Sequence, residues 1–224
     1  MTSRVIAIDG PAGSGKSTTA KAVAARLGMP HVESGALYRA VTLAALDAAV
    51  PFEGQRLAAL ARALPIRLDL AADGFRPEIA GVDVSAAIRS ERVTADVSEV
   101  SAIPEVRAWV NEEVRAAVRR HPAGAVLDGR DIGTVVFPDA ALKVFLTATP
   151  EARARRRLLQ DGRPADPEAV RREIAALELR DAKDSSRAVA PLRQADDAVP
   201  LDTSDLTFEE QVERIVALAR NLFS

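Results

Sequence analysis

A glycine-rich segment near the N-terminus places the strongest constraint on how this chain can fold. Residues 10–17 read Gly-Pro-Ala-Gly-Ser-Gly-Lys-Ser and match the pattern G-x-x-x-x-G-K-[ST] at every fixed position. The apolar run Val5–Ile8 lies one residue before the segment, and an Ala- and Lys-rich stretch with helical character, Ser17–Leu27, continues from its end. Strand, glycine-rich loop and helix stand in the order that a phosphate-binding loop requires. The motif therefore predicts a site for a nucleoside triphosphate.

Each residue type in this segment has a physical reason to be there. Glycines let main-chain N–H groups approach a polyanion because no Cβ is in the way. The helix that follows adds its unpaired N–H groups and the positive end of its dipole. Lys16 is expected to reach the β- and γ-phosphates, and the Ser17 hydroxyl is expected to ligate Mg²⁺. The residues expected to contact ATP are Gly10, Pro11, Ala12, Gly13, Ser14, Gly15, Lys16, Ser17 and Thr18. The alternative is a glycine-rich turn with a surface lysine, which would leave the flanking strand and helix unexplained.

Composition excludes several other classes of function. The 224 residues suit one substantial domain, or one core with an inserted subdomain. The formal net charge of −2 and the aromatic content of 4% argue against a nucleic-acid-binding module. The chain has no cysteine, so disulfides, thiolate metal sites and a cysteine nucleophile are excluded. No apolar run approaches the length of a membrane span or of a signal sequence. We expect a cytoplasmic protein with no membrane partner, and a monomer.

Apolar runs alternate with helical patterns along most of the chain. Strands are expected at Val5–Ile8, His31–Glu33, Ala125–Leu127, Leu142–Leu146 and Ala198–Leu201. Helices are expected over residues 16–27, 35–49, 104–120, 151–160, 167–183 and 207–222. Alternation of this kind, with strands apolar on both faces, predicts an α/β fold with a parallel sheet flanked by helices, as in P-loop NTPases.

Two segments depart from that alternation. Residues 66–88 contain short alternating runs separated by Asp73-Gly74 and by Gly81, which predicts a small antiparallel sheet inserted into the α/β chain. We expect a core of residues 1–38 and 125–224, with an insert at 39–124. The polar segment 161–167 is either part of a mobile lid, at about 154–167, or an ordinary connector between two helices.

Two further motifs follow expected strands. Residues 34–39 (Ser-Gly-Ala-Leu-Tyr-Arg) begin a helix at the sheet edge where open α/β folds bind ligands. Asp128 and Arg130 directly follow the strand Ala125–Leu127, where a carboxylate can hold Mg²⁺ and a guanidinium can bind phosphate. The alternative for this pair is a buried structural ion pair. Neither asparagine of the chain stands in an Asn-Lys-x-Asp motif, so the commonest type of GTPase is excluded.

These motifs together resemble those of the bacterial cytidylate kinases, a family of nucleoside monophosphate kinases. The likeness is carried by residues 8–17, 34–39, 127–137 (LDGRDIGTVVF) and 186–192 (SRAVAPL), together with the meander at 66–88. The resemblance implies phosphorylation of CMP, and of dCMP, by MgATP, with the insert binding the monophosphate. The alternatives are a kinase for another small acceptor, such as UMP or a non-nucleotide alcohol, and a nucleotide-dependent switch ATPase.

The resemblance also implies roles for individual residues. By this resemblance, Arg39, Arg130 and Arg187 would bind the acceptor phosphate. The base would be contacted by Ser98, Arg107 and Asp131, and the ribose by Arg180 and Asp184. Ser34 and Tyr38 belong to the same acceptor motif as Arg39, and Arg156 and Arg157 of the lid region would contact ATP. Lys16, Asp128, Arg130 and Arg187 would be the catalytic residues, with Ser17 and Asp128 at the metal.

Chemistry supports the assignment of the base, because a carboxylate at Asp131 can accept the amino hydrogen of cytosine but would repel the carbonyl of uracil. Arg180, Asp184 and Arg187 are spaced to share one face of a helix. Spacing alone would equally suit a ladder of surface ion pairs. Arg153, Arg156 and Arg157 are expected to share one face of the lid helix, with Arg155 in solvent.

Overall fold

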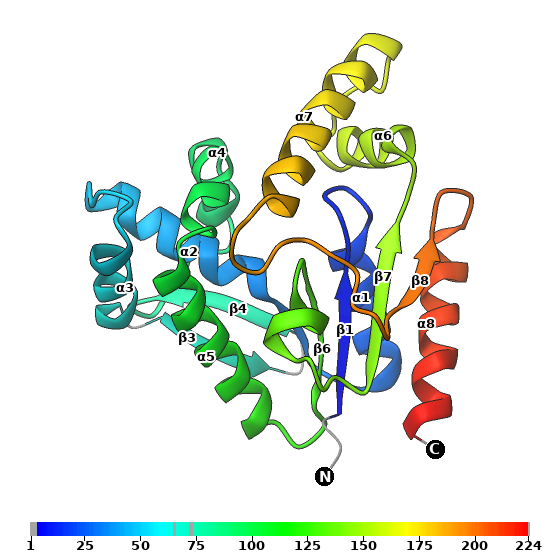
Figure 1. Cartoon of the computed structure of the whole chain (residues 1–224), viewed down its shortest axis with the longest axis horizontal. Coiled ribbons are helices and arrows are strands. Elements are labelled where there is room, and N and C mark those ends of the chain that lie inside the picture. Colours follow the sequence, from blue (N-terminus) through cyan, green and yellow to red (C-terminus); the bar gives the residue numbers. More distant parts are fainter. Residues whose placement is uncertain (1–3, 65, 72–73, 224) are drawn as a thin grey trace. The chain divides into compact units, whose positions relative to one another are not determined.

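The computed structural model describes residues 4–64, 66–71 and 74–223. The chain divides into two compact units. Unit 1 comprises residues 1–28 and 126–224, and unit 2 comprises residues 29–125. Figure 1 shows the order of the elements along the chain.

A five-stranded sheet confirms the predicted α/β class. Its strands, in spatial order, are β2 (His31–Glu33), β6 (Ala125–Gly129), β1 (Val5–Asp9), β7 (Leu142–Thr147) and β8 (Val199–Asp202). Strand β1 pairs in parallel with β7, with Ile6 opposite Leu142, and β7 pairs in parallel with β8, with Val144 opposite Val199. All five residues of β1 are buried, as expected of a strand covered on both faces.

In the part of unit 1 that the structure describes, four α-helices accompany the strands. They are α1 (Lys16–Leu27), α6 (Pro150–Gln160), α7 (Pro167–Ser185) and α8 (Phe208–Phe223). Helix α1 ends at Gly28, whose φ of 63° is left-handed and costs glycine nothing. Helices α6 and α7 begin at side-chain caps, Thr149 and Asp166, each followed by proline. Helices α1 and α8 pack against each other, as do α6 and α7 (Figure 1).

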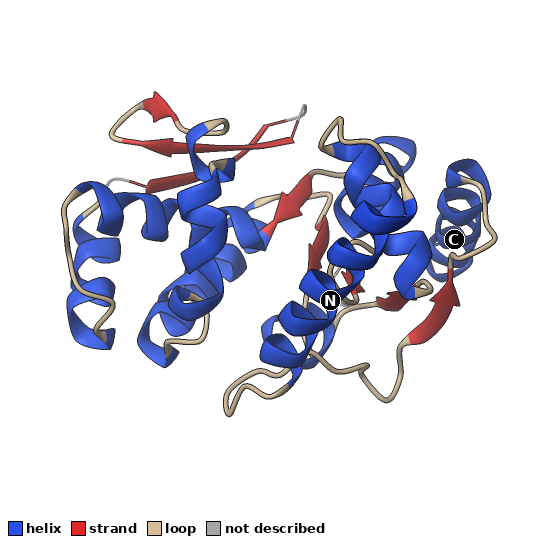
Figure 2. Ribbon diagram, turned by 90° about the horizontal axis from the view of Figure 1, so that it is seen from above, coloured by secondary structure: helices blue, strands red, loops and turns tan. Residues whose placement is uncertain are grey.

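The meander predicted at residues 66–88 is confirmed as a small antiparallel sheet in unit 2. It consists of β3 (Ile66–Ala71), β4 (Gly74–Ile79) and β5 (Val82–Asp83). Asp73 of the expected turn lies outside the described residues. Helices α2 (Ser34–Asp47) and α5 (Pro104–Arg120) contact this sheet, which Figure 2 shows in red.

Two helices of unit 2 were not predicted from the sequence. They are α3 (Gly54–Ala63) and α4 (Glu91–Val100), the latter preceded by a short 3₁₀ turn, η1 (Ala87–Arg89). Each buries apolar residues at helical spacing: Leu57 and Ala61 in α3, and Val93 and Val97 in α4. The apolar periodicity of these segments is the signal that would have found them.

Among the residues that the structure describes, no helix combines the length and the apolar character that crossing a membrane demands.

Candidate active site

The phosphate loop connects β1 to α1, and its backbone requires glycine at fixed points. Gly10, Gly13 and Gly15 have φ values of 151°, 74° and 87°. A Cβ on Gly10 would lie 2.1 Å from the carbonyl oxygen of Leu146 on β7. The sequence pattern therefore reflects both the close packing of the loop against the sheet and its left-handed turns.

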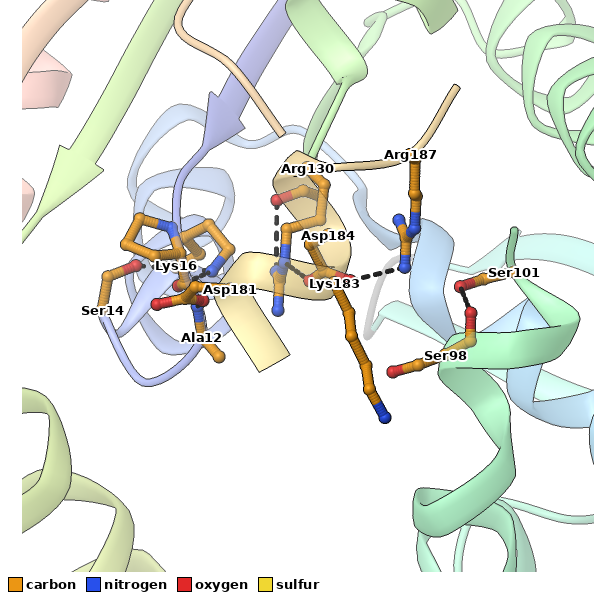
Figure 3. A network of polar contacts seen from close by, with 12 residues as sticks. Ala12, Ser14, Lys16, Ser98, Ser101, Arg130, Asp181, Lys183, Asp184 and Arg187 are labelled. Atoms are coloured by element: carbon orange, nitrogen blue, oxygen red, sulfur yellow. Dashed lines mark hydrogen bonds and ion pairs between the residues drawn. The ribbon is translucent and has the colours of Figure 1, made fainter. Parts of the chain in front are cut away.

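Lys16 is folded back over this loop and is buried. Its Nζ donates to the Pro11 carbonyl at 2.6 Å and to Ser14 Oγ at 3.3 Å (Figure 3). Burial lowers the pKa of the Lys16 ammonium well below its usual range, and the positive charge of Arg130 lowers it further. A polyanion bound at the loop would reverse this effect, because it would stabilise the protonated amine.

Ser17 and Asp128 bring two oxygen ligands together beside the loop. Ser17 lies in the first turn of α1, and its Oγ donates to Asp128 Oδ2, in β6, at 2.5 Å. Mg²⁺ is usually held by one or two protein oxygens together with phosphate oxygens and water. Within the described residues no group of three or more His, Cys, Asp and Glu side chains could hold a metal ion. The residues present therefore fit a Mg²⁺ ion whose coordination is completed by a nucleotide.

Asp184 contacts both Arg130 and Arg187, the two arginines of unit 1 for which the resemblance implies a role at the acceptor phosphate. Its Oδ2 accepts from Arg130 Nε at 2.9 Å, and its Oδ1 accepts from Arg187 at 2.5 Å (Figure 3). The side chain of Asp184 is 3% exposed and that of Arg187 is 9% exposed. Because the side chains of Asp184 and Arg187 are buried, their ion pair is not part of a ladder on the protein surface, which was the alternative that their spacing allowed. Because α7 ends at Ser185, the prediction that Arg187 continues the face of this helix is wrong.

Asp131 begins a short π-helical turn, η2 (Ile132–Val136), directly after β6. Its side chain is buried, and its carbonyl accepts from the N–H groups of Val135 at 2.9 Å and Val136 at 3.1 Å. Arg130, next to Asp131, forms its ion pair with Asp184 of α7, so this arginine has a structural partner within unit 1.

Asp9, at the end of β1, holds the other side of this turn. Its two carboxylate oxygens accept from the N–H groups of Ile132 at 2.9 Å and Gly133 at 2.7 Å. Burial raises the pKa of the Asp9 carboxyl to about 6, although these two hydrogen bonds oppose the shift. Sequence analysis missed this residue, because nothing in the pattern around it reveals a partner more than 120 residues away.

Other candidate residues lie in unit 2. Arg39 on α2 donates to the Ile88 carbonyl at 3.0 Å and to Thr94 Oγ1 at 2.9 Å. Arg107 on α5 is buried and donates to the Ser101 carbonyl at 2.9 Å, with its guanidinium 5.4 Å from the centre of the Tyr38 ring. These contacts fix the positions of two arginines in unit 2, whose planar guanidinium groups are suited to binding an anion such as phosphate.

The two serines assigned to the acceptor also lie on helices of unit 2. Ser34 is the first residue of α2 and is buried. Ser98 lies on α4, and its carbonyl accepts from Ser101 Oγ at 3.2 Å (Figure 3). Since Ser101 also accepts from Arg107, the end of α4 and the start of α5 are linked at this point.

The comparisons with known proteins agree with this arrangement. The family model described as cytidylate kinase matches residues 6–221. The chain belongs to the cytidylate kinase family. The Streptomyces avermitilis protein named cytidylate kinase is 46% identical over 216 residues, which cover 96% of this chain and 91% of that protein. Proteins with the same name from Exiguobacterium sibiricum and Mycobacterium avium are 47% and 45% identical over 218 and 220 residues. Each alignment covers 96% of this chain, and 96% and 95% of the respective relative.

A solved structure supports the fold alone. The crystal structure of an uncharacterized protein from Eubacterium ventriosum matches with a TM-score of 0.51 at 12% identity. The match covers 96% of this chain and 98% of that protein.

In this member of the cytidylate kinase family, the arginines of α6 have different partners. Arg156 donates to Thr203 Oγ1 at 2.9 Å, and Arg157 lies 3.1 Å from Asp161. Arg155 pairs with Glu151 on the exposed side of the helix, as predicted. Arg153 is buried, and its guanidinium donates to the Ala12 carbonyl of the phosphate loop, which neither Arg156 nor Arg157 is shown to contact. Arg153 is thus better placed to hold the protein's own loop than to contact a nucleotide.

Proposed function

We propose that this protein transfers the γ-phosphoryl group of ATP to CMP, and to dCMP, and so forms ADP and the pyrimidine diphosphate. The observation that carries the proposal is the match of residues 6–221 to the cytidylate kinase family. The geometry supports it, because a phosphate loop with a buried lysine lies in the same unit as the cluster of Arg130, Asp184 and Arg187.

On the donor side, we assign the triphosphate to the loop residues 10–18, with Lys16 on the β- and γ-phosphates. Ser17 and Asp128 would hold Mg²⁺, which when bound neutralises charge on the phosphate oxygens. Arg156 and Arg157 would contact the donor nucleotide from the lid, residues 154–167. Thr203, which accepts from Arg156, would then help to fix the position of that side chain.

On the acceptor side, we assign the binding of the monophosphate to an insert at residues 39–124 together with the motifs of the core at residues 1–38 and 125–224. The phosphate is assigned to Arg39, Arg130 and Arg187, the base to Ser98, Arg107 and Asp131, the ribose to Arg180 and Asp184, and further contacts to Ser34 and Tyr38. The contacts of Asp184 refine this assignment. Because it binds both Arg130 and Arg187, its first role would be to orient two guanidinium groups toward one anion.

The reaction itself needs alignment more than proton transfer. An oxygen of the acceptor phosphate attacks the γ-phosphorus in line, and the bond from that phosphorus to the bridging oxygen of ADP breaks. Lys16 and Arg130 would offset the charge that develops on the transferring group. Closure of the lid would keep out the water that otherwise hydrolyses ATP.

The preference for cytosine would rest on Asp131. Its buried carboxylate can accept a hydrogen bond from the amino group of cytosine, as carboxylates do in DNA recognition. Uracil presents a carbonyl oxygen at the same position, so the two acceptors would repel each other.

A panel of acceptors tests the proposed function. ADP release is measured in a coupled assay with ATP and CMP, dCMP, UMP, AMP or shikimate, and the Lys16→Ala variant serves as the inactive control. We expect CMP and dCMP to accelerate ADP release far more than the others. Preference for UMP or shikimate would identify a kinase for another small acceptor, and slow hydrolysis that no acceptor stimulates would identify a switch ATPase.

We also propose that the enzyme acts as a monomer in the cytoplasm, without nucleic-acid or membrane partners. The near-neutral formal charge of −2 supports this proposal, because it offers no strong attraction to anionic surfaces. Analytical ultracentrifugation at micromolar concentration tests the oligomeric state. A sedimentation coefficient that corresponds to a dimer would contradict the proposal.

A further inference from the structure

The tip of the phosphate loop is bound by a charged pair from helices α6 and α7. The Ala12 N–H donates to Asp181 Oδ1 at 2.9 Å, and the Ala12 carbonyl accepts from Arg153 at 3.0 Å. Arg153 and Asp181 also form an ion pair with each other. Figure 3 shows the Asp181 carboxylate beside the loop. The main chain of one loop residue is therefore held at both its N–H and its C=O.

This network is shielded from water. The side chains of Arg153 and Asp181 are 8% and 18% exposed, and Ala12 is 3% exposed. Charged groups attract each other more strongly where little water surrounds them. Loss of either partner would leave the other charge buried and uncompensated, which is costly.

Packing holds the same loop residues against the same two helices. The Ala12 side chain belongs to an apolar cluster whose other buried members are Ala154, Leu158, Ala169, Val170 and Leu177. A Cβ on Gly13 would lie 3.1 Å from Arg153 Cβ and 3.4 Å from Leu177 Cδ1. The loop is therefore in contact with α6 and α7 through shape as well as through charge.

The position of Asp181 connects this contact to the rest of the site. The residue directly follows Arg180 and lies three positions before Asp184 on α7. Ala12 lies within the loop assigned to the triphosphate and directly precedes Gly13, so the orientation of its peptide groups affects where the following amides point.

We propose that Asp181 is a positioning residue for the ATP site, which acts through Arg153 and the main chain of Ala12 and touches no substrate itself. This inference rests on the proposed function only in identifying ATP as the ligand of the loop. It assigns Arg153 to the protein's own loop. It also means that any movement of α7 is transmitted directly to the amides that bind phosphate.

The Asp181→Asn variant tests the proposal, because it keeps the shape and one acceptor oxygen but loses the charge that binds Arg153. Glu178→Gln is the matched control: it removes an exposed carboxylate from the same helix. We expect the Kd for MgATP, measured by calorimetry without acceptor, to rise roughly tenfold in Asp181→Asn, as for loss of a charge-assisted hydrogen bond. The control should bind as the wild type does, and the KM for CMP should stay within about twofold in both variants.

A double-mutant cycle separates positioning from general destabilisation. Arg153→Met keeps the apolar stem of the arginine, and the double variant Arg153→Met with Asp181→Asn removes both charges. If the two residues act as a unit, the double variant binds MgATP about as well as the weaker single variant. Additive losses would overturn the proposal, as would a lower melting temperature with an unchanged Kd for MgATP.

The two proposals can fail separately. If the wild-type enzyme phosphorylates CMP but Asp181→Asn binds MgATP normally, the positioning role is wrong and the function stands. If no acceptor is phosphorylated but Asp181→Asn still loses affinity for MgATP, the function is wrong and the positioning role stands.

Discussion

Ser17 Oγ and Asp128 Oδ2 lie 2.5 Å apart, although the two residues are separated by 111 positions in the sequence. The hydroxyl comes from the first turn of α1 and the carboxylate from the end of β6. The ordering of the sheet brings both oxygens to the edge where the phosphate loop begins. An oxygen pair is thus already formed where we place the metal of the donor nucleotide.

Replacement of Asp128 by asparagine should weaken the response to Mg²⁺. Asparagine preserves the size of the side chain and an acceptor for Ser17, but it removes the negative charge that attracts the cation. We expect the Mg²⁺ concentration for half-maximal turnover to rise about 10- to 100-fold, the range found for perturbed metal sites. Turnover is measured against Mg²⁺ at fixed ATP, with the exposed Asp139→Asn as the control. An unchanged Mg²⁺ dependence would remove Asp128 from the metal site.

Replacement of Lys16 by alanine should lower turnover by about 10²–10³, as for loss of other groups that stabilise transition-state charge. The reason is that we assign Lys16, a buried lysine of the loop held by Pro11 and Ser14, to the phosphates of ATP, where its charge would stabilise the transferring group. Lys21→Ala is the matched control, because Lys21 is an exposed lysine of the same helix. Near-full turnover in Lys16→Ala at saturating substrate would contradict this role.

Replacement of Asp131 by alanine should weaken the binding of CMP more than the binding of ATP. A carboxylate that reads the amino group of a base contributes about 1–3 kcal/mol, so we expect the KM for CMP to rise roughly tenfold to a hundredfold. The preference for CMP over UMP should narrow by a similar factor. Steady-state kinetics with each substrate varied in turn measure both effects, and the exposed Asp196→Ala serves as the control. If the KM values for CMP and ATP rose equally, Asp131 would not be the residue that recognises the base.

Much of the fold could be predicted from the sequence, because local patterns determine it. The helices at 16–27 and 104–120 have the predicted bounds, since glycine ends the first and Pro104 begins the second. The five strands of the main sheet were found from their apolar runs. Helices α3 and α4 were missed although each buries apolar residues four positions apart, Leu57 and Ala61 in α3 and Val93 and Val97 in α4, which is the periodicity of a helix.

The candidate site was predictable in its residue types but not in its contacts. The phosphate loop and the motif around Asp128 identified most of the polar side chains. Nothing in the sequence indicated that Asp181 would bind the loop from 169 positions away, or that Arg153 would face inward. Partners of this kind are set by how helices pack, which local periodicity does not reveal.

The buried carboxyl of Asp9 should make stability depend on pH in the direction opposite to that of a salt-bridged aspartate. Burial raises the pKa of Asp9 from its ordinary value near 3.8 to about 6 in the folded protein. The folded state therefore binds the proton more tightly than the unfolded chain does. The contribution of Asp9 to stability is fully present below about pH 4 and is lost as the pH rises to about 6. The difference between the two pKa values corresponds to at most about 3 kcal/mol.

The Asp9→Asn variant isolates this effect, because its amide resembles the protonated carboxyl: it offers one acceptor to the N–H groups of Ile132 and Gly133 and cannot ionise. We expect the free energy of unfolding of the wild type, relative to Asp9→Asn, to fall between pH 4 and pH 6 and to level off above pH 7. The exposed Asp197 provides a contrast, since its hydrogen bond from Lys143 lowers its pKa and its contribution is lost as the pH falls. Urea unfolding at each pH measures the difference. A relative stability that rises with pH over this range would show that the hydrogen bonds from η2 outweigh burial, and that Asp9 is ionised throughout.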